Sequence, residues 1–262
     1  MPNSSDIDLA VLQNSLSPKN RKWHFLPEID STNAEITRLL PSHPPEEELI
    51  VIADYQTGGK GRSGRVWHSA PGTGIYLSML IRPNLSPEQL PIVTLIAGLA
   101  TAIAVNEFIS KPAQLKWPND LLLNNKKIAG VLCEYHATEV PAVVIGIGIN
   151  VNQIQFPDDI KNIATSLKLE SGLETDRTTL IKQLVTQLDF QYTELKNNKV
   201  QTIIDNWTRH SDLFGKSISI NKGDQSIIGK AIRLDPLGRL VILNESGKEI
   251  ALDSGEVRIQ RK

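Results

Sequence analysis

The spacing of apolar positions changes several times over the first 213 residues, and it predicts a domain of mixed helices and strands. Helical spacing marks residues 7–16, 87–109 and 178–210, and N-capping side chains at 30–33 predict another helix ending near Pro41. Apolar and β-branched runs predict strands at 49–53, 74–81, 128–134 and 140–151, and one starting at Gln114. Short strands joined by tight turns predict an α+β fold with a mixed or antiparallel sheet flanked by helices.

The pattern changes after Phe214, where only short β segments follow. They lie at residues 217–220, 226–234, 240–243, 249–252 and 257–259 and are separated by turn residues. Such a series is typical of a small β-barrel. We therefore place a domain boundary at Leu213, with a large domain at 1–213 and a small domain at 214–262.

Composition narrows the class of protein. The chain has 262 residues, 40% of them hydrophobic, which is enough for a core that needs no covalent staples. Lys and Arg total 28 against 29 for Asp and Glu, so the net charge of -1 gives no general attraction to nucleic acid. The single cysteine, Cys133, excludes an intrachain disulfide framework and fits a reducing cytoplasm.

Neither export nor membrane insertion is expected. The first eight residues are polar and acidic and lack a basic start followed by an apolar run, so the sequence predicts no secretory or transit peptide. The most apolar stretch, residues 91–109, approaches membrane length but contains Thr94, Asn106 and Glu107. These polar positions favour a buried helix of a soluble protein.

The most informative segment is a glycine-rich cationic loop at residues 58–67, Gly-Gly-Lys-Gly-Arg-Ser-Gly-Arg-Val-Trp. Its glycines let the backbone approach a ligand, and Lys60, Arg62 and Arg65 supply positive charge, so the loop suits an anion. A solvated basic turn has the same composition and is the competing interpretation. The spacing fits neither a P-loop nor a dinucleotide-binding fingerprint, which excludes both assignments.

A second candidate segment is Lys-Trp-Pro-Asn-Asp at residues 116–120. Pro118 prevents a regular helix and exposes Asn119 and Asp120 at a bend, although the same residues are common in ordinary turns. A little further on, Lys127 lies among small and apolar residues, where its charge needs either an anion or solvent.

A third segment, residues 145–152, alternates glycine with isoleucine. In a strand this alternation puts Gly146 and Gly148 on one face and the isoleucines on the other. The glycine face leaves room for a flat or bulky group, or for a helix packed on the sheet.

Together these segments resemble biotin protein ligases in their order and spacing. The cationic loop ending at Trp67, residues 116–120 with 127–130, and strand 146–150 carry the resemblance, and Ser31-Thr32-Asn33 and Gln56-Thr57 extend it over most of residues 21–213. It implies a class II synthetase-like catalytic domain and an SH3-like C-terminal β-barrel. It also implies an enzyme that forms biotinyl-5′-AMP from biotin and ATP and transfers biotin to a lysine of the biotin carboxyl carrier protein of acetyl-CoA carboxylase.

The resemblance also implies the site. Biotin is expected at hydroxyl, amide, glycine and cationic positions, where hydroxyls and amides satisfy its ureido ring. These positions are Ser31, Thr32, Asn33, Gln56, Gly59, Lys60, Gly61, Arg62, Lys127, Gly146 and Gly148. ATP and the adenylate are expected at Arg62, Arg65, Trp67, His68, Asn119, Lys127, Asn150 and Arg177.

Two of these residues, Lys60 and Arg177, have a second interpretation. Where the family loop often has arginine this chain has Lys60, which lacks bidentate geometry, so we expect its backbone to contribute more than its ammonium. Arg177 follows an aspartate at a predicted helix start and could instead be a surface residue. Lys127 is expected to bridge the biotin carboxylate and the α-phosphate, with Arg62 holding phosphate.

The expected catalytic residues are Lys127, Arg62 and Asp120. The acceptor lysine has a free pKa of about 10.4, so only roughly one part in a thousand is neutral at pH 7. Asp120 is expected to orient that amine or accept its proton. Its alternative role is to bind the Mg²⁺ that ATP brings.

Two other functions fit the same fold. A lipoate or octanoate ligase or transferase would need an apolar tunnel in place of the amides at Asn33 and Gln56, and a biotin-binding sensor would bind without turnover. Many family members carry an N-terminal helix-turn-helix domain, but only about 20 residues precede Trp23, so we expect no repressor role. A monomer or weak homodimer is expected.

Overall fold

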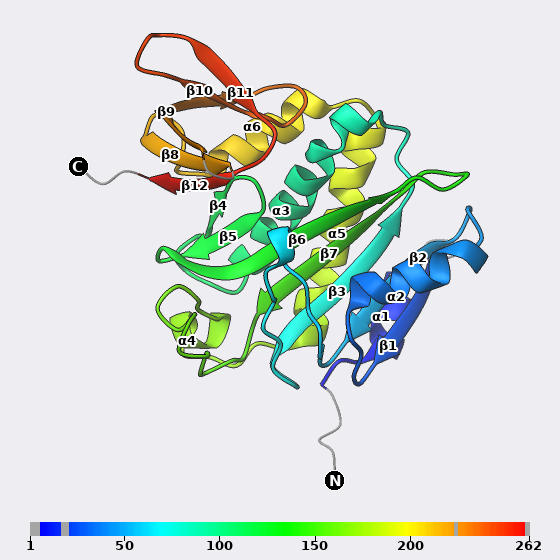
Figure 1. Ribbon diagram of the computed structural model, residues 1–262. Helices are drawn as coiled ribbons and strands as arrows, with labels where there is room; N and C mark the ends of the chain where they lie inside the picture. Colours follow the sequence, from blue (N-terminus) through cyan, green and yellow to red (C-terminus); the bar gives the residue numbers. More distant parts are fainter. Residues whose placement is uncertain (1–5, 17–20, 223–224, 260–262) are drawn as a thin grey trace.

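The computed structural model describes residues 6–16, 21–222 and 225–259, and its centre is a seven-stranded sheet (Figure 1). The strand order is β1-β2-β3-β7-β6-β5-β4. Strand β1 is parallel to β2, and all other neighbours in this sheet are antiparallel. The expected α+β fold with a mixed sheet is confirmed.

The elements of this sheet and of the helices around it agree with most of the apolar pattern. The strands are β1 (Arg21–Leu26), β2 (Glu48–Ala53), β3 (Gly74–Ile81), β4 (Gln114–Lys116), β5 (Asp120–Leu123), β6 (Lys126–His136) and β7 (Ala142–Asn150). The α-helices are α1 (Leu9–Ser15), α2 (Thr32–Leu39), α3 (Pro91–Asn106), α4 (Leu167–Ser171), α5 (Arg177–Lys196) and α6 (Val200–Arg209). Short 3-10 turns lie at Leu40–Ser42, Arg62–Gly64 and Pro87–Gln89.

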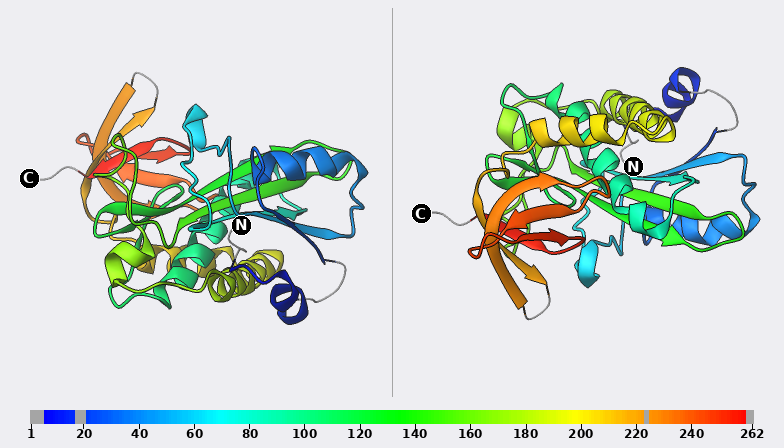
Figure 2. Two further views of the ribbon diagram at one scale, coloured as in Figure 1. Left: turned by 90° about the horizontal axis from the view of Figure 1, so that it is seen from below. Right: turned by 90° about the horizontal axis from the view of Figure 1, so that it is seen from above.

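The sheet separates two layers of helices (Figure 2). On one face α3 and α5 pack over a large hydrophobic cluster that includes Ile145, Ile147 and Ile149 of β7. On the other face α2 packs on β2, β3 and β7 through Ile36. The isoleucines of β7 therefore face α3 and α5, and the glycines between them face the side of α2.

Helix α3 is the apolar stretch noted in the sequence. Pro91 starts it, and most of its residues are buried against α5 and the sheet. The stretch Pro87–Asn106 is long and apolar enough to cross a membrane, but 67% of its most apolar window is buried inside the protein. Its apolar character is explained by the core, as expected.

Three elements differ from the expectations. Strand β1 was not expected, and it extends the sheet by pairing in parallel with β2. The predicted helical region 178–210 is two helices, because Asn198 at φ 58° reverses the chain between α5 and α6. Helix α4 is a short turn of helix capped by Ser166 and ended by Gly172 at φ 75°.

The C-terminal residues form a second, five-stranded antiparallel sheet. It consists of β8 (Ser217–Lys222), β9 (Gln225–Leu234), β10 (Leu240–Leu243), β11 (Glu249–Leu252) and β12 (Glu256–Ile259), in the order β11-β10-β9-β8-β12. The sheet fits an SH3-like domain, but the expected closed barrel is wrong. Closure requires the two edge strands to pair, and β11 and β12 have four residues each and pair on one side only.

The small sheet lies against the large domain beside α3. The indole of Trp117, which is 2% exposed, donates a hydrogen bond to the Gly238 carbonyl at 3.2 Å. A Cβ added at Gly238 would lie 3.0 Å from Leu95 of α3, so the turn before β10 packs closely on that helix. The division of the chain at Leu213 stays a prediction.

Candidate active site

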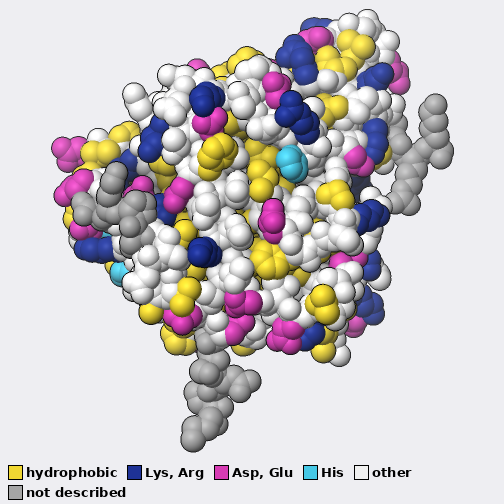
Figure 3. Space-filling view, turned by 180° about the vertical axis from the view of Figure 1, so that it is seen from behind, with side chains coloured by type: hydrophobic (Ala, Val, Ile, Leu, Met, Phe, Trp, Pro, Cys, Tyr) yellow, Lys and Arg dark blue, Asp and Glu magenta, His cyan; other side chains and the backbone are white. Residues whose placement is uncertain are grey.

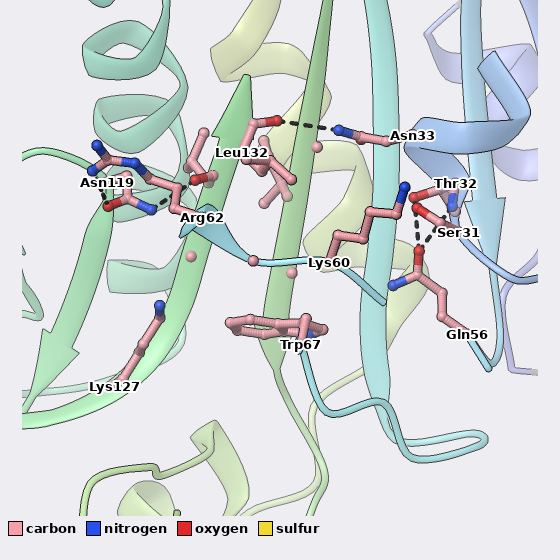
Figure 4. Close-up of a pocket in the computed structure, with 16 residues that line it drawn as sticks. Ser31, Thr32, Asn33, Gln56, Lys60, Arg62, Trp67, Asn119, Lys127 and Leu132 are labelled. Atoms are coloured by element: carbon pink, nitrogen blue, oxygen red, sulfur yellow. Dashed lines mark hydrogen bonds between the residues drawn. The ribbon is translucent and has the colours of Figure 1, made fainter. Parts of the chain in front are cut away.

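A pocket opens on the α2 side of the sheet, where the loop between β2 and β3 crosses β6 and β7 (Figure 4). Its walls come from the start of α2, this loop, β6 and β7. The lining residues are Ser31, Thr32, Asn33, Gln56, Lys60, Gly61, Arg62, Trp67, Asn119, Lys127, Gly130, Val131, Leu132, Gly146, Ile147 and Gly148. Segments separated by more than a hundred residues therefore meet here, and they include parts of all three segments that the sequence singled out.

One end of the pocket is a network of hydroxyl and amide groups, which we call the amide end: Thr32, Asn33, Gln56 and Ser78. The backbone N–H and the hydroxyl of Thr32 both donate to Gln56 Oε1, at 2.8 and 3.1 Å. The Ser78 hydroxyl lies 2.7 Å from Thr32 Oγ1 and 2.6 Å from Asn33 Oδ1. All four residues are buried, so these hydrogen bonds fix the side chains before any ligand arrives.

The amide group of Asn33 is held in one orientation. Its Nδ2 donates to Glu134 Oε2 at 2.6 Å and to the Leu132 carbonyl at 3.4 Å, while its Oδ1 accepts from Ser78. A carboxylate acts only as an acceptor, so Glu134 requires the NH₂ group on its side. The Asn33 oxygen is consequently turned toward β3 and β7.

The floor of the pocket requires glycine. A Cβ added at Gly146 would lie 2.2 Å from Asn33 Oδ1, and one at Gly148 would lie 2.4 Å from the Trp67 ring. Across the β6–β7 ladder Gly130 pairs with Gly148, and a Cβ there would meet Lys127 and Trp67. The Trp67 indole thus lies flat on a glycine surface, which agrees with the room that the sequence predicted for a flat group.

The opposite end of the pocket carries Arg62, Asn119 and Lys127, which lie on the other side of Trp67 in Figure 4. We call it the cation end and count Asp120 with it. Arg62 donates to Asn119 Oδ1 at 3.1 Å, and Asn119 Nδ2 donates to the Val131 carbonyl at 2.8 Å. Lys127 Nζ lies 2.6 Å from Asp120 Oδ1 and 5.4 Å from the centre of the Trp67 ring.

Burial lowers the pKa of the Arg62 guanidinium, and the Asp120 carboxylate partly offsets this while Arg65 adds to it. A guanidinium stays protonated at any physiological pH despite such a shift. Two cations, Arg62 and Lys127, therefore line the pocket, and one carboxylate, Asp120, is paired with Lys127. Such a set favours a ligand that carries negative charge.

The rest of the cationic loop lies farther out. Gly59 and Trp67 form a bridge in which Trp67 N donates to the Gly59 carbonyl at 2.9 Å, and a Cβ at Gly59 would lie 2.6 Å from the Trp67 carbonyl. The side chains of Lys60, Arg65 and His68 are exposed, and of these only Lys60 lines the pocket. Gly59, Arg65 and His68 stay predictions as ligand contacts.

Asp120 and Asn150 do not line the pocket but support one of its cations. Asp120 forms the ion pair with Lys127. Asn150 Nδ2 donates to the Thr165 carbonyl at 3.0 Å and to the Lys127 carbonyl at 3.5 Å. Asn150 therefore fixes the backbone of Lys127, and its contact with the nucleotide stays a prediction.

Arg177 is placed differently from the sequence expectation. It is neither at the pocket nor on the surface: its side chain is 1% exposed and forms ion pairs with Asp6 and Asp54. Burial acts to lower its pKa, but hydrogen bonds and charge from Asp6 and then Asp54 raise that pKa above its ordinary value. The guanidinium is enclosed by these carboxylates and the Gly74 carbonyl, and its contact with the nucleotide stays a prediction.

Sequence reasoning missed Ser78 and Glu134. Ser78 is a single polar residue inside the fully buried strand β3, directly opposite Gly146, and that interruption was a usable signal. Glu134 contacts Asn33 across 101 positions of sequence, and no local pattern indicates the contact.

Comparison with known proteins agrees with this geometry. Residues 25–152 match the Biotin/lipoate A/B protein ligase family. The bifunctional ligase/repressor BirA of Bacillus subtilis is 36% identical over 227 residues, which cover 85% of this chain and 70% of BirA. The biotin–[acetyl-CoA-carboxylase] ligase of Mycobacterium tuberculosis is 32% identical over 260 residues, 96% of this chain and 95% of that protein.

A solved structure gives the same answer for the fold. The biotin protein ligase from Aquifex aeolicus in complex with biotin and ATP superimposes with a TM-score of 0.76 at 31% identity, covering 94% of this chain and all of that one. This chain belongs to the biotin protein ligases of the biotin/lipoate A/B protein ligase family.

Proposed function

We propose that this protein is a biotin–protein ligase, which joins biotin and ATP to biotinyl-5′-AMP and transfers the biotinyl group to a lysine of a biotin carboxyl carrier protein. The observation that carries the proposal is the position of Lys127 and Arg62 at one end of a pocket whose other end is a pre-ordered amide network. The relatives named above are ligases for biotin, and the Aquifex structure binds biotin and ATP.

The amide end suits the ureido ring of biotin. That ring has a carbonyl acceptor and two N–H donors, and Thr32, Asn33 and Gln56 supply fixed hydroxyl and amide groups at the pocket wall. An octanoyl or lipoyl chain offers no such groups, so it would leave these polar side chains facing hydrocarbon. The pocket therefore favours biotin over those alternative substrates.

The cation end suits the first reaction. The carboxylate oxygen of biotin attacks the α-phosphorus of ATP, and pyrophosphate leaves. Both reactants are anions, so Lys127 and Arg62 lower their mutual repulsion and hold them in line. We assign Trp67 and Gly148 to the flat surface over which the adenylate lies.

The second reaction uses a lysine amine of the carrier. Its nitrogen attacks the acyl carbon, AMP leaves with the electron pair of the broken C–O bond, and the amine loses a proton. We assign Asp120 to orient the amine or accept that proton, because its carboxylate lies beside Lys127 at the cation end. When AMP leaves, its phosphate no longer neutralises Lys127, and Asp120 is then the negatively charged partner of that lysine.

Mg²⁺ would be held mainly by the phosphates of ATP. Among the described residues no group of three His, Cys, Asp or Glu side chains is placed to hold a metal ion, and Asp120 is already paired with Lys127. Mg²⁺ commonly binds nucleotide phosphates with only one or two protein carboxylates. The donor set therefore fits a metal that arrives with the nucleotide, with Asp120 as its protein ligand if it has one.

The partner, compartment and assembly follow from this assignment. We expect the carrier protein of acetyl-CoA carboxylase as the macromolecular substrate, in the cytoplasm, with residues 1–213 acting as the catalytic domain and the enzyme a monomer or weak homodimer. Positive and negative side chains are interspersed on the face seen from behind (Figure 3), and the net charge is -1. A duplex DNA partner is therefore not expected.

The test is exchange of labelled pyrophosphate into ATP, measured with biotin and then with lipoate or octanoate. We expect exchange with biotin alone, and biotinylation of the carrier when it is added. Exchange only with lipoate or octanoate would identify the other ligase. Biotin binding by calorimetry without exchange would identify a sensor and reject the enzyme.

A further inference from the structure

Arg177, which does not line the pocket, lies where both ends of the ligand-binding loop meet. This loop comprises residues 54–73, between β2 and β3, and carries Gln56, Arg62 and Trp67 into the pocket. Arg177 Nη1 donates to Asp54 Oδ1 at 2.9 Å and to the Gly74 carbonyl at 3.0 Å. Asp54 is the first residue after β2, and Gly74 is the first residue of β3, so one nitrogen atom joins the two stems.

Further contacts hold the base of loop 54–73 in place. The Tyr76 hydroxyl accepts from Ala70 N at 2.8 Å and donates to the Ala70 carbonyl at 3.1 Å, which fixes the returning half of the loop. A Cβ at Gly74 would lie 2.4 Å from that hydroxyl, so the stem has no space to shift. In the part of the loop that follows β2, Gln56 is only two residues from Asp54, and its amide group belongs to the amide end.

The opposite side of the Arg177 guanidinium is held by the N-terminal segment. Arg177 Nε donates to Asp6 Oδ1 at 2.6 Å. The adjacent Thr178 hydroxyl donates to the Asp6 carbonyl and accepts from Asp8 N, both at 2.8 Å. Asp6 thus completes the set of acceptors that a buried guanidinium needs.

We propose that Arg177 is a positioning residue that closes the base of loop 54–73 and so holds Gln56, Arg62 and Trp67 ready for ligand. The effect on biotin rests on the function proposed above, while the effect on the loop does not. Fixing both stems restricts the conformations open to the loop residues between them, and a loop that is already ordered loses less entropy when ligand binds. Asp54 acts in the same way, and Asp6 supports Arg177 from behind.

The experiment compares Arg177→Lys with Arg21→Lys. Arg21 is a matched control, since its side chain is 2% exposed and is likewise held by two carboxylates, Glu48 and Asp189, but it touches neither the loop nor the pocket. Each variant is digested with trypsin under native conditions, and cleavage after Lys60, Arg62 and Arg65 is quantified by mass spectrometry. Cleavage after the exposed Lys161 serves as the internal reference.

In Arg177→Lys we expect cleavage of the loop to rise about tenfold relative to Lys161, which corresponds to losing a charge-assisted hydrogen bond at the base of the loop. Arg21→Lys should lower Tm comparably and leave the ratio unchanged. The KM for biotin should rise with loop cleavage in this variant and stay unchanged in Arg21→Lys. If Arg177→Lys does not fold, Asp54→Asn removes the negative charge that pairs with Arg177 at the loop and should raise loop cleavage more than Asp6→Asn does.

Three results would overturn the proposal. An equal cleavage ratio in the Arg177 and Arg21 variants would make Arg177 a general stability residue. A raised KM for ATP with unchanged loop cleavage would show that Arg177 acts on nucleotide binding and not on the loop. Increased loop cleavage without any change in the KM for biotin would show that order in the loop does not affect biotin binding. Absence of biotin-dependent exchange in the unmodified protein would reject the proposed function and leave the cleavage comparison valid.

Discussion

The amide end and the cation end of the pocket are built in different ways. At the amide end, buried side chains bind one another at 2.6–3.1 Å, and Glu134 and Ser78 fix the orientation of Asn33. At the cation end, Lys127 is about one-third exposed and has a single carboxylate partner, and Lys60 and Arg65 are exposed. The amide end is therefore complete without ligand, while the cation end is completed by the anions it binds.

This difference separates recognition from chemistry. A pre-ordered polar network rejects molecules that do not satisfy it, because every unpaired buried group costs free energy. The cations Lys127 and Arg62 stabilise the negative charge that develops as the biotin carboxylate attacks the phosphate. Substitutions at the amide end should therefore change biotin affinity, and substitutions at the cation end should change rates.

The largest effect is expected at Lys127. Lys127→Gln removes the cation nearest Trp67 and Asp120, and kcat for biotin-dependent pyrophosphate exchange should fall about 10²- to 10³-fold, as when one electrostatic contact to a developing charge is lost. Biotin affinity measured by calorimetry should change much less. Lys126→Gln, one residue earlier and exposed, is the control and should leave exchange intact. Equal losses in the two variants would contradict the assignment.

A smaller effect, confined to the second step, is expected at Asp120. Asp120→Asn keeps the shape but removes the base, so transfer to the carrier should slow by about 10²-fold, the usual contribution of general base catalysis. Single-turnover transfer from preformed adenylate measures this step apart from adenylate formation. Equal slowing of both half reactions would show that Asp120 serves only to place Lys127.

At the amide end, Gly146→Ala should weaken biotin binding by about 10- to 100-fold. The new methyl group would overlap Asn33 Oδ1 and break its contact with Ser78, which costs about 1–3 kcal/mol. Calorimetric titration with biotin measures the change. The control is Gly98→Ala in α3, where the new Cβ would make an ordinary contact with Leu115 at 3.4 Å. Unchanged affinity in Gly146→Ala would show that Asn33 is not needed for biotin.

The smallest effect is expected for Ser78→Ala. It removes one hydroxyl from the network and leaves Asn33 attached to Glu134, so the Kd for biotin should rise about fivefold, equivalent to about 1 kcal/mol. The rate of adenylate formation at saturating biotin should stay the same. A loss of rate at saturation would mean that the two ends of the pocket are coupled, contrary to the comparison.

The sequence alone predicted the parts of the molecule that depend on local pattern. Alternation of Gly146 and Gly148 with isoleucine placed two faces of β7 correctly, and the family motifs brought Lys127 and Arg62 together. The edge strand β1 escaped detection because only Trp23 among its six residues is buried, so the strand has no alternating burial. Closure of the small barrel failed as a prediction since it depends on the meeting of two four-residue strands, which no local pattern encodes.

The sequence could not predict contacts between residues that are far apart along the chain. The position of Arg177 at a helix start was visible in the sequence, but its burial depends on Asp6 and Asp54, which are 171 and 123 positions away. Glu134 is likewise recognisable as a site residue only through Asn33. In each case the charge of the residue indicated that it needed a partner, and only the fold showed which partner it has.

The placement of Trp67 gives the protein an optical reporter of its own site. The other three tryptophans, Trp23, Trp117 and Trp207, are 7%, 2% and 1% exposed, and none of them lines the pocket. Trp67 lies on the pocket floor, and within the described part of the chain its indole nitrogen has no hydrogen-bond partner. Indole fluorescence depends on polarity and nearby charge, so a change in emission on addition of ligand reports occupancy of the pocket from one residue, without any label.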